Sequence, residues 1–251
     1  MRGIHLIGNW KMHKTREEAE NFFAQLRSII DCEQAGVGFA VPYTAIHASF
    51  ASVLGTKIAI GAQSVSEHVS GAFTGEISTA MIHDVGASFV LVGHSERRHV
   101  FGETDEVINR KLKRAQGDGL AVVLCVGETL EQRENGKIRE TIQKQLEMGL
   151  AGEVDRDVII AYEPVWAIGT GEVATPAVAN EIHWFCREVL NERFGPGSGD
   201  QTPILYGGSV SPDNIEDLIK MPEIDGCLIG GASLAAEKFG KIVNIARSTT
   251  S

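Results

Sequence analysis

The chain has 251 residues, of which 28 are glycine and four are cysteine, and its net charge is −10 at pH 7. A hydrophobic fraction of 43% and a charged fraction of 22% are those of a folded globular protein, which excludes a mainly disordered chain. The negative charge disfavours nucleic acid and anionic membrane surfaces as partners, because both are bound by clustered Lys and Arg.

Eight short apolar runs recur along the chain, and each is followed by a glycine or a polar residue. Uninterrupted apolar runs such as 89–92 are typical of strands that are buried on both faces of a parallel sheet. The predicted strands span residues 4–8, 37–41, 57–62, 88–93, 121–126, 158–162, 203–207 and 226–229.

Helical patterns lie between these strands. Residues 15–30 open with Thr15 and Glu18 at the spacing of a capping box, and Pro212 takes the first helical position of a segment that starts at Ser211. Residues 104–116, 134–148 and 176–194 show the same periodicity. Eight strands alternating with about eight helices predict an α/β fold, a single (β/α)8 barrel domain over residues 1–251. An open doubly wound sheet is the alternative, although no GxGxxG motif follows the first strand.

The N-terminus and the cysteines predict a cytoplasmic protein. The apolar run after Met1 is too short for a signal peptide, since Asn9 and Lys11 interrupt it. The longest apolar stretch, residues 120–126, is far shorter than the roughly 20 residues of a membrane helix. The four cysteines are widely separated, which argues against a disulfide framework and a metal site.

Polar side chains follow three strands at the end where the active site of a barrel forms. Asn9 and Lys11 follow the first strand and offer a neutral donor and a cation. His94 follows the fourth strand, and Ser95 is expected to cap a helix whose dipole keeps His94 neutral. Glu163 follows the sixth strand among apolar neighbours, which makes it a candidate general base.

The segments after strands six, seven and eight suit a phosphorylated substrate. Residues 164–171 combine Pro164 and Trp166 with two glycines, a composition that favours a lid moving between two hinges. Glycine pairs at 207–208 and 230–231 leave backbone N–H groups free to approach a phosphate. The set predicts proton abstraction next to a carbonyl in a small phosphorylated molecule. Taken singly, each feature also has a purely structural explanation, such as a solvated lysine, a packing histidine or an ordinary loop.

Several segments, in order along the chain, resemble the triosephosphate isomerase family. They are residues 8–12, 70–78, 92–98, 125–129, the run YEPVWAIGTG at 162–171, and the two glycine pairs. The resemblance implies a TIM barrel that interconverts dihydroxyacetone phosphate and D-glyceraldehyde 3-phosphate through an enediolate, in glycolysis and gluconeogenesis and without a cofactor.

The resemblance also implies a role for each matching residue. Glu163 would be the base that moves a proton between C1 and C2, and His94 would polarise the carbonyl. Lys11 and Asn9 would stabilise the enediolate. Glu96 would be a buried partner behind the site, with Ser95, Cys125 and Glu128 as neighbours. Phosphate would bind backbone N–H groups of Gly169, Ser209, Gly230 and Gly231. The lid would comprise Pro164, Val165, Trp166, Ala167, Ile168, Gly169, Thr170 and Gly171.

The loop at 71–78 resembles the dimer loop of the family and implies a homodimer, with Thr74 reaching a neighbouring subunit and Gln63 in the receiving region. His13 and Ser64 stand where many relatives carry Asn, and Ala235 replaces a frequent Lys. Two alternatives stay open: another phosphate-binding barrel enzyme such as a pentose-phosphate epimerase, and a catalytically silent barrel that serves as a binding partner.

Overall fold

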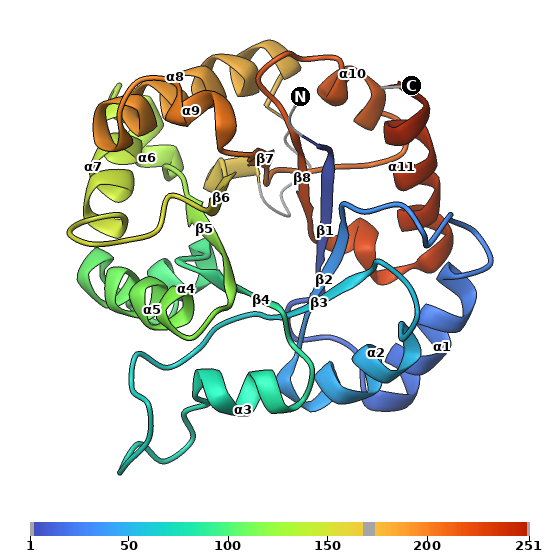
Figure 1. The fold of residues 1–251 in the computed structure, drawn as a ribbon. Helices are drawn as coiled ribbons and strands as arrows, with labels where there is room; N and C mark the ends of the chain where they lie inside the picture. The colour runs from blue at the N-terminus through green and yellow to red at the C-terminus, as the bar shows by residue number, and fades with distance from the viewer. Residues whose placement is uncertain (1–2, 168–173, 250–251) are drawn as a thin grey trace.

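The computed structural model describes residues 3–167 and 174–249, and its strands form a closed barrel (Figure 1). Within these residues eight strands pair in sequence order, all in parallel, and the last pairs with the first. The predicted (β/α)8 barrel is therefore confirmed, and the open doubly wound sheet is wrong. The strands are β1 His5–Asn9, β2 Val37–Val41, β3 Ala59–Ala62, β4 Phe89–Val92, β5 Ala121–Val126, β6 Val158–Tyr162, β7 Ile204–Tyr206 and β8 Gly226–Ile229.

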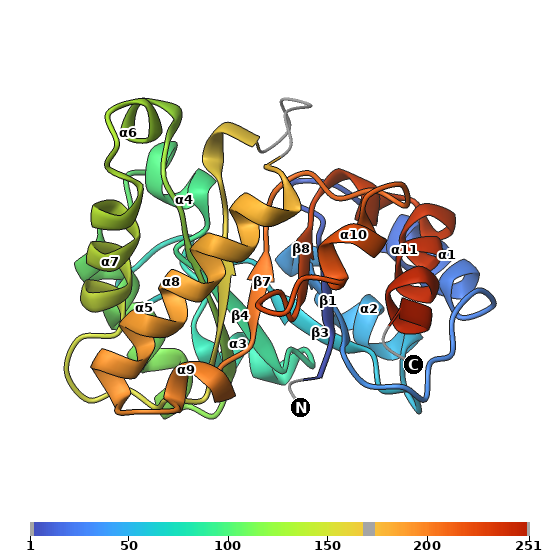
Figure 2. The same ribbon diagram turned by 90° about the horizontal axis from the view of Figure 1, so that it is seen from above.

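Helices surround the barrel and cover its outer face in both views (Figures 1 and 2). The α-helices are α1 Arg16–Leu26, α2 Ile46–Ser52, α3 Thr79–Asp84, α4 Ser95–His99, α5 Asp105–Gly117, α6 Leu130–Glu134, α7 Ile138–Gly149, α8 Pro176–Phe194, α9 Ser198–Gln201, α10 Ile215–Ile219 and α11 Ala236–Thr249. The short 3₁₀ helices are η1 Tyr43–Ala45, η2 Val165–Ala167 and η3 Gly231–Leu234.

Two separate apolar cores explain why the strands read as uninterrupted apolar runs. In β4, Phe89 and Leu91 pack inside the barrel, whereas Val90 and Val92 pack in the layer between the sheet and the helices. Successive side chains of a strand point to opposite faces, so a strand covered on both sides needs apolar residues at every position. The interior core comprises Ile7, Ala40, Phe89, Leu91, Val123, Cys125, Ala161, Leu205 and Leu228.

Local chemistry sets most helix ends. The capping box of Thr15 and Glu18 is present at the start of α1, but α1 ends at Leu26 rather than at residue 30. The predicted helix at 134–148 is wrong as one unit, because α6 ends at Glu134 and α7 begins at Ile138. Gly136 between them has a φ of 70°, which lies in the left-handed region and ends an α-helix.

The prediction that Pro212 begins a helix is also wrong, since α10 begins at Ile215. The Asn214 side chain bonds to the backbone of this segment: its Oδ1 accepts the N–H of Ser211 at 2.8 Å, and its Nδ2 donates to the carbonyl of Ser209 at 3.1 Å. These local bonds compete with helix formation. They also hold the loop that follows β7.

A buried arginine ties together the amino ends of β7 and β8, opposite the end where the strands finish. Arg187 is 2% exposed and forms ion pairs with Glu223 at 2.7 Å and Asp225 at 2.6 Å. It also donates to the carbonyls of Gly199 and Thr202. Each donor of this guanidinium therefore has a partner in the apolar surroundings, as a buried charge requires.

Replacing Arg187 by Met is expected to lower the free energy of unfolding by roughly 3–5 kcal/mol, because it removes the cation that faces the buried carboxylate of Asp225 and the partly buried carboxylate of Glu223. Arg139→Met is the matched control: Arg139 is 54% exposed and pairs with Glu181, so its loss should cost less than about 1 kcal/mol. Urea unfolding of both variants measures the difference. Equal stabilities would show that the Arg187 network does not hold the strand ends together.

Candidate active site

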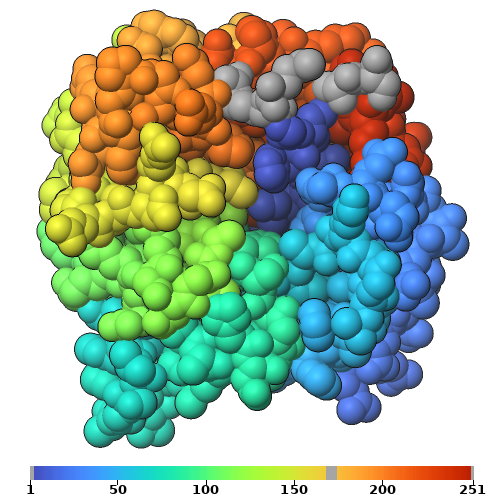
Figure 3. All heavy atoms as spheres, in the orientation of Figure 1, coloured from blue at the N-terminus to red at the C-terminus, as the bar shows by residue number. Residues whose placement is uncertain are grey.

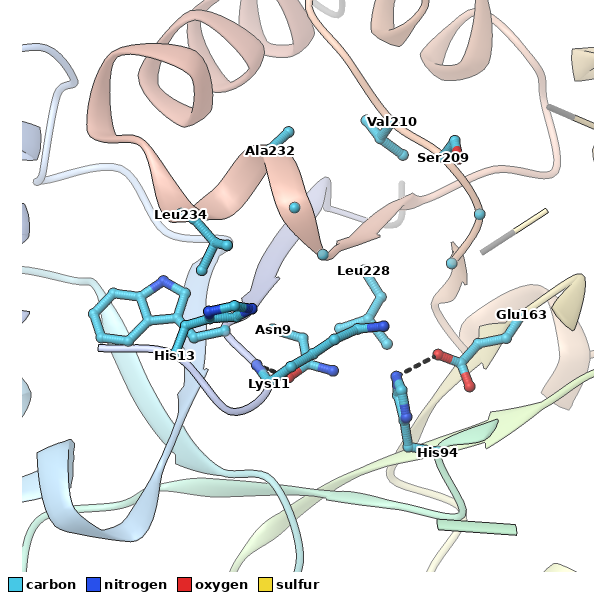
Figure 4. Close-up of a pocket in the computed structure, with 15 residues that line it drawn as sticks. Asn9, Lys11, His13, His94, Glu163, Ser209, Val210, Leu228, Ala232 and Leu234 are labelled. Carbon is cyan, nitrogen blue, oxygen red and sulfur yellow. Dashed lines mark hydrogen bonds and ion pairs between the residues drawn. The ribbon is translucent and has the colours of Figure 1, made fainter. Parts of the chain in front are cut away.

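A pocket of about 370 Å³ lies at the carboxyl ends of the strands (Figure 4). In Figure 3 the dark blue atoms of the N-terminal segment lie near the centre of the face drawn, and atoms from later parts of the chain surround them. The pocket is lined by Asn9, Trp10, Lys11, His13, His94, Glu163, Gly207, Gly208, Ser209, Val210, Leu228, Gly230, Gly231, Ala232 and Leu234. The structure thus brings the described candidate residues from the ends of β1, β4, β6, β7 and β8 to one place.

The turn after β1 is held by side-chain hydrogen bonds. Lys11 has a φ of 51°, a left-handed conformation that is costly for a residue other than glycine, and its N–H donates to Asn9 Oδ1 at 3.0 Å. Gln63 Nε2 donates to the carbonyl of Lys11 at 2.8 Å. The strained turn directs the Lys11 side chain across the pocket toward His94 (Figure 4).

Glu96 is not the buried partner that the sequence analysis expected. Its side chain is 46% exposed, and it pairs with Lys11 Nζ at 2.6 Å. Glu96 lies in the first turn of α4 and lines a second hollow beside the pocket, where water can solvate the carboxylate. Its charge therefore acts on Lys11 from the rim.

His94 and Glu163 form a buried contact. His94 Nε2 lies 3.0 Å from Glu163 Oε1, and the two side chains are 7% and 3% exposed. The N–H of Ser95 donates to Glu163 Oε2 at 2.9 Å. The expected cap by Ser95 is wrong, because His94 itself caps α4: its Nδ1 accepts the N–H of Glu96 at 3.2 Å. Ser95 instead supplies a backbone donor to Glu163.

The contact decides the direction of both pKa shifts. Burial has the largest single effect, raising the pKa of Glu163 and lowering that of His94. The opposite charges outweigh it, so the pKa of Glu163 is lowered, helped by the N–H of Ser95, and the pKa of His94 is raised by Glu163. The helix dipole alone therefore does not set the protonation state of His94. The N–H that faces Nδ1 favours neutral imidazole once Glu163 moves away from Nε2.

The pair has a predictable pH dependence. A raised pKa means that His94 contributes stability that is fully present below its ordinary pKa of 6.5 and is lost as pH rises through the raised value. Glu163 has a lowered pKa, so the stability that its ionised carboxylate contributes is present above its ordinary pKa of 4.5 and is lost as the pH falls below that value. We expect His94→Gln to cost more free energy of unfolding at pH 5.5–6 than at pH 9. Urea unfolding at several pH values measures this, and a cost independent of pH would contradict it.

The loops after β7 and β8 form the wall opposite His94 (Figure 4). Ser209, Gly230 and Gly231 line it, and Gly231 begins η3. Backbone N–H groups at the start of such a turn bind anions. The buried indole Nε1 of Trp10 donates to the carbonyl of Ser233 within η3 at 3.1 Å, so the end of β1 is bonded directly to this turn.

Gly207 is required by the close approach of the Glu163 side chain. A Cβ at this position would lie 2.8 Å from Cγ of Glu163 and 3.1 Å from the carbonyl oxygen of Tyr162. Both distances are shorter than ordinary van der Waals contact. Any larger residue at 207 would displace Glu163, so the first member of the β7 glycine pair serves packing rather than anion binding.

The described part of the predicted lid comprises Pro164, Val165, Trp166 and Ala167; Ile168, Gly169, Thr170 and Gly171 lie outside the described residues. Trp166 Nε1 donates to Glu128 Oε1 at 2.9 Å, and Ser209 Oγ donates to the carbonyl of Ala167 at 2.8 Å. The start of the lid is thereby bonded both to the end of β5 and to the loop after β7.

Two further predicted neighbours are fully buried. Cys125 lies in the barrel interior, where burial and the nearby Glu163 raise its thiol pKa. Glu128 accepts the hydroxyl of Tyr162 at 3.2 Å as well as the indole of Trp166, and burial raises its pKa. Both residues support the walls of the site without lining the pocket.

The loop that carries Thr74 lies apart from the pocket. The segment between β3 and α3 projects away from the barrel (Figure 1), and Thr74 on it is exposed. A second hollow of about 330 Å³ adjoins the pocket and is lined in part by Gln63, Glu96 and Phe101. Met12, which also lines it, is 95% exposed. Gln63 therefore faces this hollow and also holds the Lys11 turn.

Sequence reasoning missed the contacts that support the pocket from behind. Neither the Gln63 amide on the Lys11 turn nor the Trp10 bond to Ser233 has a local sequence signal, because the partners are 52 and 223 positions apart. Within the described residues, no group of three or more His, Cys, Asp or Glu is placed to hold a metal ion. None of the described helices is long and apolar enough to cross a membrane.

Comparison with known proteins gives consistent matches over the whole chain. A family model described as triosephosphate isomerase matches residues 4–246. The triosephosphate isomerase of Protochlamydia amoebophila is 48% identical over 97% of this chain and 93% of its own length. That of Carboxydothermus hydrogenoformans is 49% identical over 97% and 98%. A crystal structure of triosephosphate isomerase from Bartonella henselae has a TM-score of 0.89 and 38% identity, and covers 98% of this chain and 100% of that one.

Proposed function

The chain belongs to the triosephosphate isomerase family, and from that premise we propose how its own residues carry out the reaction. The enzyme interconverts dihydroxyacetone phosphate and D-glyceraldehyde 3-phosphate, a step of glycolysis. The family therefore favours this reaction over that of a pentose-phosphate epimerase and over a catalytically silent barrel. The observation that supports our assignment of roles is the His94–Glu163 contact at 3.0 Å in the same pocket as Lys11 and the η3 turn.

Glu163 is the base. Its lowered pKa keeps it ionised at neutral pH, and its carboxylate is held by polar contacts with Ser95 and His94. When substrate enters, Glu163 exchanges these contacts for the reacting carbon, takes a proton from C1 of dihydroxyacetone phosphate and returns it at C2. Burial makes the carboxylate a stronger base at that moment, because its partners no longer stabilise the charge.

His94 and the β1 turn act on the substrate oxygens. His94 Nε2–H, released by Glu163, donates to the carbonyl and shuttles protons between the two oxygens of the enediolate. Lys11 supplies a positive charge, and Asn9 supplies a neutral amide on the same turn. Donors that are already in place when negative charge develops on these oxygens lower the barrier most effectively.

The phosphate group binds the backbone N–H groups of Ser209, Gly230 and Gly231, and that of Gly169 in the lid. Residues 164–171 close over the bound substrate and exclude water, which prevents the enediolate from losing its phosphate. The bond from Ser209 Oγ to the carbonyl of Ala167 supports this coupling, since it joins the phosphate loop to the lid. No cofactor takes part in these steps.

An assay coupled to glyceraldehyde 3-phosphate consumption tests the function directly. We expect rapid formation of this product from dihydroxyacetone phosphate and competitive inhibition by inorganic phosphate. Inhibition that is not competitive would contradict a phosphate subsite within this pocket.

The assembly we propose is a homodimer. The projecting loop that carries Thr74 and the hollow lined by Gln63 support it, as do the exposed apolar side chains of Met12 and Phe101 beside that hollow. Thr74 would then approach the site of the neighbouring copy. Sedimentation equilibrium should give twice the chain mass of 27.1 kDa; a mass of one chain at micromolar concentration would contradict it.

We also propose that residues 1–251 form one domain and that the protein works in the cytoplasm. The four free cysteines, which are separate in the structure, support the cytoplasmic location, because that compartment keeps thiols reduced. Gluconeogenesis would use the same reaction in reverse.

A further inference from the structure

The segment between Lys11 and α1 contains an unusual concentration of backbone strain. Lys11 and Lys14 are the positive-φ residues other than glycine in the described chain, with φ values of 51° and 76°. Both values lie in the region that side chains with a Cβ adopt at a cost. At Lys11 two hydrogen bonds compensate: its N–H donates to Asn9 Oδ1, and its carbonyl accepts the amide of Gln63. A different contact must compensate at Lys14.

The ammonium of Lys14 makes that contact with two buried aromatic rings. Its Nζ lies 5.3 Å from the centroid of the Trp10 ring and 4.9 Å from that of Phe22. These distances are those of cation–π attraction. Trp10 is fully buried and Phe22 nearly so, and Lys14 is itself half-buried, so the attraction is not fully screened by water.

The neighbouring residues of the segment do not make this contact with the aromatic rings. Met12 is 95% exposed, and His13 is exposed at the pocket rim. Glu18, the carboxylate whose charge acts on Lys14, is bonded to the N–H and hydroxyl of Thr15 in the capping box. Burial lowers the pKa of Lys14, and Glu18 opposes this shift.

Trp10 connects this contact to the site. It lies in sequence between Asn9 and Lys11, and its indole donates to the carbonyl of Ser233 in η3, the turn whose first residues line the phosphate wall. A displacement of the Trp10 ring would therefore move the Lys11 turn and the phosphate-binding turn together.

We propose that Lys14 is a positioning residue: by holding the Trp10 ring, it sets the position of the Lys11 turn and of the Gly230–Gly231 phosphate cradle. This role rests on the proposed function. The ligand group that it affects is the phosphate of the substrate, which Lys14 does not touch.

The test compares variants at residue 14. Lys14→Met keeps the chain length and the backbone strain but lacks the charge, and we expect it to raise both Ki for inorganic phosphate and KM for glyceraldehyde 3-phosphate by roughly threefold to tenfold. Lys14→Arg keeps a cation over the rings, so its Ki and KM should equal those of the wild type. Arg16→Met is the matched control, since Arg16 is 76% exposed and pairs only with Glu20 among the described residues.

A purely structural role would lower the melting temperature without changing Ki. Lys14→Gly separates the two effects, because glycine removes the strain and also the ammonium. We expect it to raise Ki as Lys14→Met does, even where its melting temperature equals or exceeds that of the wild type. An unchanged Ki in Lys14→Gly, or a raised Ki in Lys14→Arg, would overturn the proposal. Absence of competitive phosphate inhibition in the wild type would instead refute the proposed site itself.

Discussion

Replacing Glu163 by Gln is expected to lower kcat by about 10²–10⁴-fold, the contribution of a positioned general base. Gln has the same shape and its amide oxygen can still accept the N–H of Ser95, now 2.9 Å from Glu163, so the fold should be preserved. An amide cannot accept the proton from C1 at neutral pH. The measurement is steady-state kinetics in both directions, with urea unfolding of the same preparation.

Glu134→Gln is the control for this variant. Glu134 is exposed at the end of α6 and does not line the pocket, and its substitution removes the same charge. Its kcat should equal that of the wild type. Near-normal turnover of a folded Glu163→Gln variant would assign the base to another residue.

Replacing Lys11 by Met should produce the second largest effect, a fall in kcat/KM of about 10²–10³-fold, comparable to the loss of one preorganised charge-stabilising donor. Lys11 reaches across the pocket at the end of a strained turn, and the protein as a whole carries −10. A dianionic substrate is therefore repelled by the net charge and attracted by this local cation. We expect both a higher KM and a lower kcat.

Lys57→Met is the control, because Lys57 is exposed and its removal changes the net charge equally. The kcat/KM of Lys57→Met should differ little from that of the wild type. High salt should make this difference smaller still, because it screens exposed charges. A Lys11→Met variant within about threefold of the wild type would mean that His94 and Asn9 stabilise the enediolate without the charge of Lys11.

The net charge illustrates how composition can mislead about a small ligand. A value of −10 argues against extended polyanions, which contact many residues at once. A single phosphate instead responds to the field inside one pocket. We propose that this field comes from Lys11 and from backbone N–H groups at η3. The formal charge does not include those N–H groups.

The sequence by itself determined the barrel and the strand ends that form the pocket. Apolar runs buried on two faces, as in β4 and β5, lack the alternation of apolar and polar residues that a half-exposed strand shows. Asn9, His94 and Glu163 stand directly after such runs, and parallel strands bring their carboxyl ends to one face. The Thr15 capping box and the start of α8 at Pro176 also depend only on residues that are close in sequence.

Only the tertiary structure decided how these residues are held. The N–H of Ser95 donates to Glu163, which is 68 positions away in the sequence, and Lys11 donates to Glu96, which is 85 positions away. Whether Glu96 is buried depends on how α4 lies at the rim, and the contact of Lys14 with Trp10 depends on two aromatic rings supplied by different elements. Local patterns report hydrogen bonds and periodicity along the chain, whereas these contacts depend on the register and packing of segments that become neighbours only when the barrel closes.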